Sequence, residues 1–160
     1  MHTRLSALLF SLFLAAALPL AAHAADAHQH DHGSADTPKL QLDSGKKWAT
    51  DKTLRQAMAE INQAVGEALP LIHQDKFDAR QYGALAATVN RKVAYAVANC
   101  KLDPKTDAML HLVIADLLAG AEIMDGKAAG TRHDGAVRVL QALRAYGRHF
   151  QHPGWRLAKG

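Results

Sequence analysis

Four stretches with helical periodicity dominate the chain beyond residue 50 and constrain its fold more than any other feature. In the first stretch, apolar side chains recur at spacings of four and three, from Leu54 through Ile61 to Ile72. This spacing places them along one side of an α-helix. None of the four stretches shows the strict alternation of apolar and polar residues that is typical of a half-buried strand. The sequence therefore predicts an all-α domain.

The expected helix starts follow from residues that cap free backbone amides. Thr50 or Asp51 precedes the first stretch, Asp78 precedes the second, and Asp103 precedes the third and is followed by proline. A side-chain oxygen at this position accepts a hydrogen bond from an unpaired amide, and proline suits the first helical position. The first three helices are therefore expected to begin at these residues, and the fourth near Asp134.

The expected helix ends follow from breakers and from the apolar pattern. Pro70 is predicted to kink the first helix or end it early, because proline lacks an amide hydrogen and clashes with the preceding turn. The apolar face of the second helix is expected to run through Val97 to Cys100, which places the thiol on the buried side. Gly126 is expected to close the third helix, and Pro153 to stop the fourth.

Short turns between the four stretches require sequential helices to be neighbours that run in opposite directions. The predicted fold is an antiparallel up-down-up-down four-helix bundle at residues 48–156, followed by a short tail at residues 157–160. In this topology the first helix starts at the end of the bundle where the second finishes, the third starts and the fourth finishes.

The amino terminus has the layout of a secretory signal peptide. Arg4 supplies a basic start, a largely apolar stretch runs from Leu5 to Ala22, and Ala22-His23-Ala24 places small residues where signal peptidase cleaves. Residues 1–24 are therefore predicted to be removed, and the mature protein to be periplasmic or secreted. No later stretch offers about 18 consecutive apolar residues, so stable membrane insertion is not expected after cleavage.

Composition narrows the partners and the chemistry. Loss of Arg4 lowers the basic residues from 19 to 18 against 15 acidic residues, and their scattered arrangement predicts no nucleic-acid partner. Cys100 is the only cysteine, which excludes an intramolecular disulfide. The sequence contains no CxxCH, HExxH, ExxH or phosphate-loop motif, and the serines of the predicted mature chain, Ser34 and Ser44, lie near its start. An enzyme is therefore not expected.

Residues 25–47 form a His-rich segment after the predicted cleavage site. Its first part, ADAHQHDHGSADTPK, is short of large apolar side chains, so a flexible tail is expected. His28, His30 and His32 alternate around Gln29 and Asp31, a composition typical of segments that bind copper, zinc or nickel. His28 would be the fourth mature residue, one place beyond the position that tight amino-terminal copper binding requires. A solvated polar spacer is the alternative.

The predicted topology gathers further candidate ligands at one end of the bundle. They are Cys100, His111, His149 and His152. Thiolate and imidazole suit copper, which favours a periplasmic, non-enzymatic metal-binding protein with a copper site formed by Cys100, His111 and either His149 or His152. Isolated histidines more often bond to a neighbour or to water, and an inert buried thiol is an equal alternative for Cys100. His111 and His149 are each expected to point inward or to lie at the boundary of the core.

Three stretches resemble a known family. The segments LQLDSGKKWATDKTLRQAM, VANCKLDPKTDAMLHLVIADLLAGAE and HFQHPGW are similar to small exported bacterial proteins described as DnrO-like. The resemblance covers nearly the whole predicted mature domain and implies export and the domain limits. The family name implies a loose link with denitrification or nitric-oxide response, and no activity follows from it.

The order of segments is also similar to the soluble b-type cytochrome bundles, in which a methionine early in the first helix and a histidine late in the fourth hold haem. Met58 and His149 are the matching positions, with His149 a couple of residues from where the motif would place it. This resemblance implies haem b as the alternative cofactor of a haem-binding or gas-responsive bundle. A bundle without a cofactor that serves as an interaction module, through the surface around Trp155, is a further alternative of equal standing.

Overall fold

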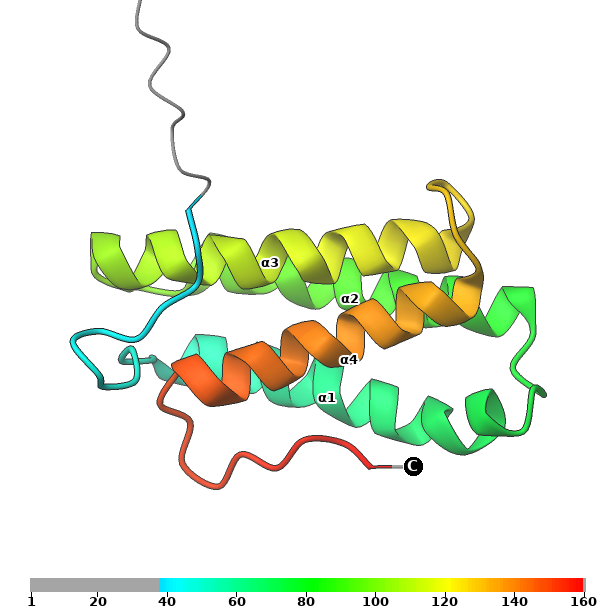
Figure 1. Cartoon of the computed structure of the whole chain (residues 1–160), viewed down its shortest axis with the longest axis horizontal. Coiled ribbons are helices and arrows are strands. Elements are labelled where there is room, and N and C mark those ends of the chain that lie inside the picture. Colours follow the sequence, from blue (N-terminus) through cyan, green and yellow to red (C-terminus); the bar gives the residue numbers. More distant parts are fainter. Residues whose placement is uncertain (1–37, 160) are drawn as a thin grey trace, which may run out of the picture. The chain divides into compact units, whose positions relative to one another are not determined.

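The computed structural model describes residues 38–159, which form four helices (Figure 1). They are α1 (Lys52–His73), α2 (Ala79–Asn99), α3 (Pro104–Asp125) and α4 (Arg132–His149). Within residues 38–159 there is no strand, and only two isolated bridges join extended residues. The prediction of an all-α domain with four helices is confirmed. The predicted signal peptide and the His-rich stretch at residues 25–37 lie outside the described residues.

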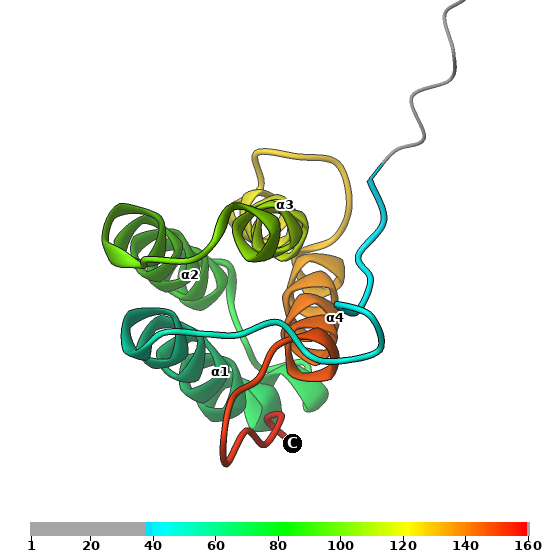
Figure 2. The same ribbon diagram turned by 90° about the vertical axis from the view of Figure 1, so that its left-hand side faces the viewer.

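The chain reverses direction at each connection between helices (Figure 1). Seen along the bundle, α1 and α3 each lie between α2 and α4, which face each other across the core (Figure 2). Hydrogen bonds tie the ends that this alternation brings together. The Asp51 carboxylate accepts from the Lys101 amide (2.6 Å), and the Trp48 amide donates to the His149 carbonyl (2.8 Å).

Caps start the helices largely as the sequence predicts. Asp51, Asp78 and Asp103 are the N-caps of α1, α2 and α3, and each accepts from backbone amides of the first turn. The fourth helix begins at Arg132, earlier than expected, because Thr131 is its cap. Asp134 completes a reciprocal capping box by accepting from the Thr131 amide (2.9 Å), so it lies inside the first turn.

Pro70 does not end α1 early, because the helix continues to His73. Its side chain lies on the exposed side, while Leu69 and Ile72 on either side of it are buried in the core. Proline removes one backbone hydrogen bond, and the packing of its neighbours holds the last turn in place. The chain turns at Asp75, which adopts a positive φ of 54°.

The apolar core runs the length of the bundle, with one error in the predicted faces. Val97 was expected to be buried but is 54% exposed, and Ala96 is buried in its place. The α-helix has 3.6 residues per turn, so a residue three positions after Val93 returns to the core side. Repeated spacings of four residues rotate the predicted face gradually away from the core. The largest fully buried side chains are Tyr146, Phe150, Leu54, Met58, Ile61, Leu110, Leu117, Met124, Leu143, Val65, Val89 and Val113.

Two glycines allow α3 and α4 to approach closely. A Cβ atom on Gly120 would lie 2.8 Å from the carbonyl oxygen of Gly135, and a Cβ on Gly135 would lie 2.6 Å from that of Gly120. Backbone atoms cannot move aside as a flexible side chain would. The two helices therefore require glycine at both positions to pack at this distance.

The C-terminal segment, residues 150–159, leaves the bundle end and returns beside α1 (Figure 1). The fourth helix ends at His149, before Pro153, because Phe150 takes extended geometry and pairs with Trp48. Asn62 of α1 then holds the segment through both amide atoms. Its Nδ2 donates to the Arg156 carbonyl (2.9 Å), and its Oδ1 accepts from the Ala158 amide (2.9 Å).

At the other terminus, residues 38–48 cross the same end of the bundle. The indole Nε1 of Trp48 donates to the Gln41 carbonyl (2.6 Å), and Leu40 packs against the core.

Among the helices of residues 38–159, none combines the length and the apolar character needed to span a bilayer.

Candidate functional site

Four of the predicted ligands, Cys100, His111, His149 and His152, come from the described residues at the shared end of the bundle. The shared end is defined as the region around Asp51, Cys100, Asp103 and His149. Asp51 connects two segments at this end, because both of its carboxylate oxygens accept hydrogen bonds. Oδ1 accepts from the Leu54 amide (2.7 Å) at the start of α1, and Oδ2 accepts from Lys101 in the α2–α3 connection. The sequence offered Thr50 or Asp51 as the cap, and the second bond of Asp51 depends on a residue fifty positions away.

Cys100 lies at this end as the C-cap of α2, with extended backbone geometry and a half-buried side chain. Cys100 thus lies one residue beyond α2, and it packs against the core as a partly buried side chain. Burial raises the pKa of its thiol, and the carboxylates of Asp51 and Asp107 raise it further. A raised pKa keeps the sulfur protonated at neutral pH, which lowers both its nucleophilicity and its readiness to bind a metal.

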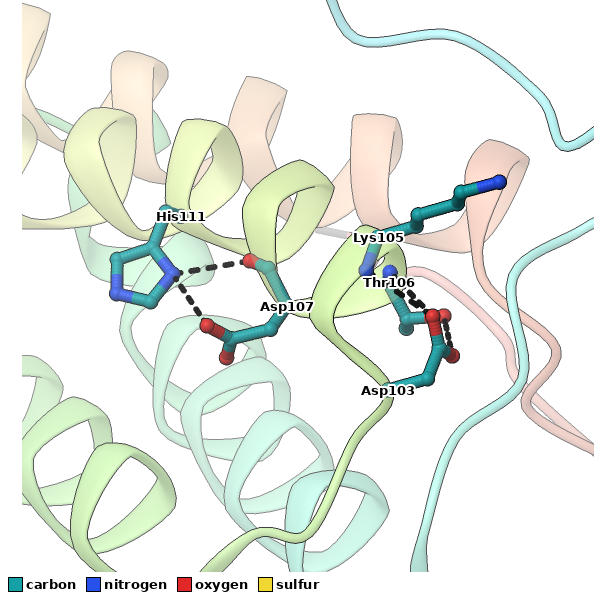
Figure 3. A network of polar contacts seen from close by, with 5 residues as sticks. All are labelled: Asp103, Lys105, Thr106, Asp107 and His111. Atoms are coloured by element: carbon teal, nitrogen blue, oxygen red, sulfur yellow. Dashed lines mark hydrogen bonds and ion pairs between the residues drawn. The ribbon is translucent and has the colours of Figure 1, made fainter.

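His111 points away from the core, contrary to the expectation that it faces inward or lies at the core boundary (Figure 3). Its side chain is 57% exposed. Nδ1 lies 2.9 Å from the Asp107 carbonyl one turn earlier and 3.4 Å from the Asp107 carboxylate. The imidazole therefore lies along the outside of α3. In the same view, Asp103 accepts from the backbone amides of Lys105 and Thr106 and caps the helix.

His149 is half-buried at the end of α4, and its Nδ1 lies 2.8 Å from the Ala145 carbonyl. A carbonyl only accepts, so Nδ1 carries the proton and Nε2 keeps its lone pair when the ring is neutral. This tautomer is the one that metal-binding histidines commonly use. His149 is thus chemically competent as a single ligand.

His152 lies beyond α4 and belongs to an aromatic cluster. Its Nδ1 is 3.0 Å from the buried hydroxyl of Tyr146, and its ring centroid is 4.9 Å from that of Trp155.

Burial lowers the pKa of His152, and the nearby Arg55 guanidinium lowers it further. Burial also raises the pKa of Tyr146. Both groups are therefore neutral near pH 7.

The structure does not gather the predicted copper ligands into one site. Within residues 38–159, no three side chains of His, Cys, Asp or Glu lie close enough together to hold a metal ion. Cys100 is half-buried at the end of α2, His111 faces outward, and His152 is close to the Tyr146 hydroxyl. The remaining predicted metal ligands, His28, His30 and His32, lie outside the described residues.

The predicted haem ligands differ in environment. Met58 is 2% exposed and is one of the side chains that fill the core, as methionine commonly does. His149 lies at the boundary of the core with Nδ1 bonded to its own helix.

The Tyr146, His152 and Trp155 cluster is the feature that sequence reasoning missed. Trp155 lies edge-on to Tyr146, with centroids 4.9 Å apart, and packs against Gly147. One signal was present in the sequence. Gly147 interrupts an otherwise helical stretch shortly before HPGW, and such a glycine often marks a close approach of another group.

Comparison of the chain with protein families, curated proteins and solved structures found no match.

Proposed function

We propose that this protein is an exported, non-enzymatic metal-binding protein that holds copper through the imidazoles of His28, His30 and His32. The observation that carries the proposal is the placement of three imidazoles within five residues, with Asp31 among them. Neighbouring residues of this kind form a chelate without any tertiary contact. Among divalent first-row metals, copper(II) binds nitrogen ligands most tightly. Export follows from the signal-peptide layout of residues 1–24.

In this proposal the helical domain is a scaffold without a cofactor of its own. Three observations support that role: the Cys100 thiol has a raised pKa, His111 faces solvent, and Met58 is packed in the core. His111 and His149 both hold Nδ1 against a carbonyl of their own helix, which leaves Nε2 of each with a lone pair for a metal. One imidazole alone forms a weak site, so tight binding is assigned to the three tail histidines.

A copper titration against a competing chelator tests the proposal on the chain from Ala25 onward. The variant H28A/H30A/H32A is expected to lose tight copper binding. The matched variant C100S/H111A/H149A removes the same number of candidate ligands from the bundle and is expected to keep it. Loss of binding in the bundle variant alone would assign the site to the shared end, and weak binding by the unmodified chain would reject a metal-binding role.

A visible spectrum after incubation with haem tests the alternative cofactor. No sharpening or shift of the Soret band of free haem is expected, because Met58 occupies the packed core and is not available to an added ligand without repacking. A sharpened or shifted Soret band that M58A and H149A both abolish would replace copper with haem.

A further inference from the structure

The outer side of α4 is basic. The helix contains four arginines and a single acid, Asp134. Arg138 is paired with Asp116 of α3, with Nη2 and Oδ1 2.8 Å apart. Arg144 and Arg148 lie one turn apart on the exposed side, and neither takes part in an ion pair within residues 38–159.

A basic turn lies against the last turn of this helix. Lys46 and Lys47 are both exposed, and the Lys47 ammonium donates to the Gly147 carbonyl (2.6 Å). Paired backbone hydrogen bonds between Asp43 and Lys46, each 2.8 Å, close the turn. Figures 1 and 2 show this N-terminal segment looping past the end of α4. The Lys47 bond thus brings this basic turn against the last turn of α4, which carries Arg148.

An apolar side chain accompanies these cations. Leu42 is 40% exposed, in the same loop as Lys46 and Lys47. The basic patch is defined as Leu42, Lys46, Lys47, Arg144 and Arg148. Asp43 is the only acid of residues 41–47, and Lys46 takes part in no ion pair within the described chain.

We propose that the basic patch docks the protein on an anionic phospholipid surface. It is formed by a turn and the outer side of a helix, and it combines arginine and lysine with an exposed leucine. Peripheral membrane proteins use this combination, because the cations attract lipid phosphates while the apolar side chain enters the interface. Capture by an acidic protein surface is the alternative that the experiment below separates from lipid binding. The inference is independent of metal binding.

Co-sedimentation with lipid vesicles tests this docking on the chain from Ala25 onward, in the presence of a chelator. Binding is expected to phosphatidylcholine vesicles that contain phosphatidylglycerol, and not to phosphatidylcholine alone. It should weaken as salt rises, because salt screens exposed charges. Inorganic phosphate at the same concentration as the lipid headgroups should not displace the protein, since free phosphate offers no interface for Leu42.

Two double charge reversals that change the net charge of the protein equally show which surface binds the lipid. Each basic side chain near an anionic bilayer strengthens binding roughly fivefold, so R144E/R148E should lose at least about twenty-five-fold. The control R80E/R91E changes two exposed arginines of α2, on the opposite side of the bundle, and should bind much more tightly than R144E/R148E. L42S should weaken binding without changing its salt dependence. Circular dichroism checks that each variant is folded.

Three outcomes would overturn the inference. Equal losses in the two charge reversals would show that only net charge matters. Absence of binding to anionic vesicles at low salt would remove the lipid surface as the partner, and capture by polyglutamate under the same conditions would reassign the patch to acidic proteins. Displacement by inorganic phosphate alone would identify a simple anion site.

Discussion

The indole of Trp155 occupies the space that a side chain at Gly147 would need. A Cβ atom built on Gly147 would lie 2.6 Å from Cδ1 of the indole and closer still to Nε1. Gly147 of α4 and Trp155 of the C-terminal segment therefore fit together, because Gly147 has no side chain and Trp155 fills the space. This contact holds the segment against the end of the bundle.

Gly147→Ala should destabilise the fold by about 1 to 3 kcal/mol, because the added methyl group forces the indole out of its place. The loss should exceed the gain in helix propensity, which is about 1 kcal/mol for this change. Urea unfolding followed by circular dichroism measures it. Gly83→Ala in α2 is the control, since its Cβ would meet only Asp125 Oδ1 at 3.5 Å. Equal stability of the two variants would contradict the proposed packing.

Asn62→Ala should loosen the C-terminal segment, because one side chain supplies both of its bonds to α1. A cost of about 1 kcal/mol is expected, since water can replace part of the lost bonding. Hydrogen exchange at the Ala158 amide should become faster while exchange in the core of α3 remains slow. Gln63→Ala, which removes only a surface bond to Glu67, is the control. Unchanged exchange at Ala158 would argue against this anchor.

Stability should fall as the pH is lowered through the titration of His152. Its pKa in the folded protein lies below the ordinary value of 6.5, so the unfolded chain binds the proton more readily. The unfolded state is therefore favoured progressively from about pH 6.5 down to the folded pKa. His152→Asn, which keeps a polar atom near the Tyr146 hydroxyl, should flatten this dependence. The free energy of unfolding is measured against pH for both proteins, and the difference between the two curves gives the contribution of His152 apart from the other histidines. Parallel curves would refute the prediction.

Cys100 should react slowly with thiol reagents at neutral pH, because burial and two carboxylates raise its pKa and only the thiolate reacts. Asp107→Asn removes one of these charges and should speed the reaction. Asp116→Asn, on the same helix but paired with Arg138, should leave the rate unchanged. A reaction as fast as that of a free cysteine in the unmodified protein would disprove the raised pKa.

Sequence reasoning succeeded where the signal was local. The N-caps Asp51, Asp78 and Asp103 act on amides two or three residues away. Gly126 ends α3 as predicted, and it does so with left-handed geometry at φ 77°. At Pro70 the early end that the sequence allowed does not occur, because α1 continues to His73 with buried neighbours around the proline. Cys100, His111 and His149 lie at the end of the bundle where the topology placed them, but the direction of each side chain did not follow from position.

The sequence by itself therefore determined the four helices, most of their starts and, for the most part, which side of each helix is buried. These features depend on residues within about four positions of one another. Only the tertiary structure decided that His111 faces solvent, that His152 bonds to Tyr146, and that Trp155 packs on Gly147. Side-chain direction at the shared end depends on contacts between distant segments. Trp48 bonds through its backbone to both His149 and Gln151, about a hundred residues along the chain, and no local pattern encodes that pairing.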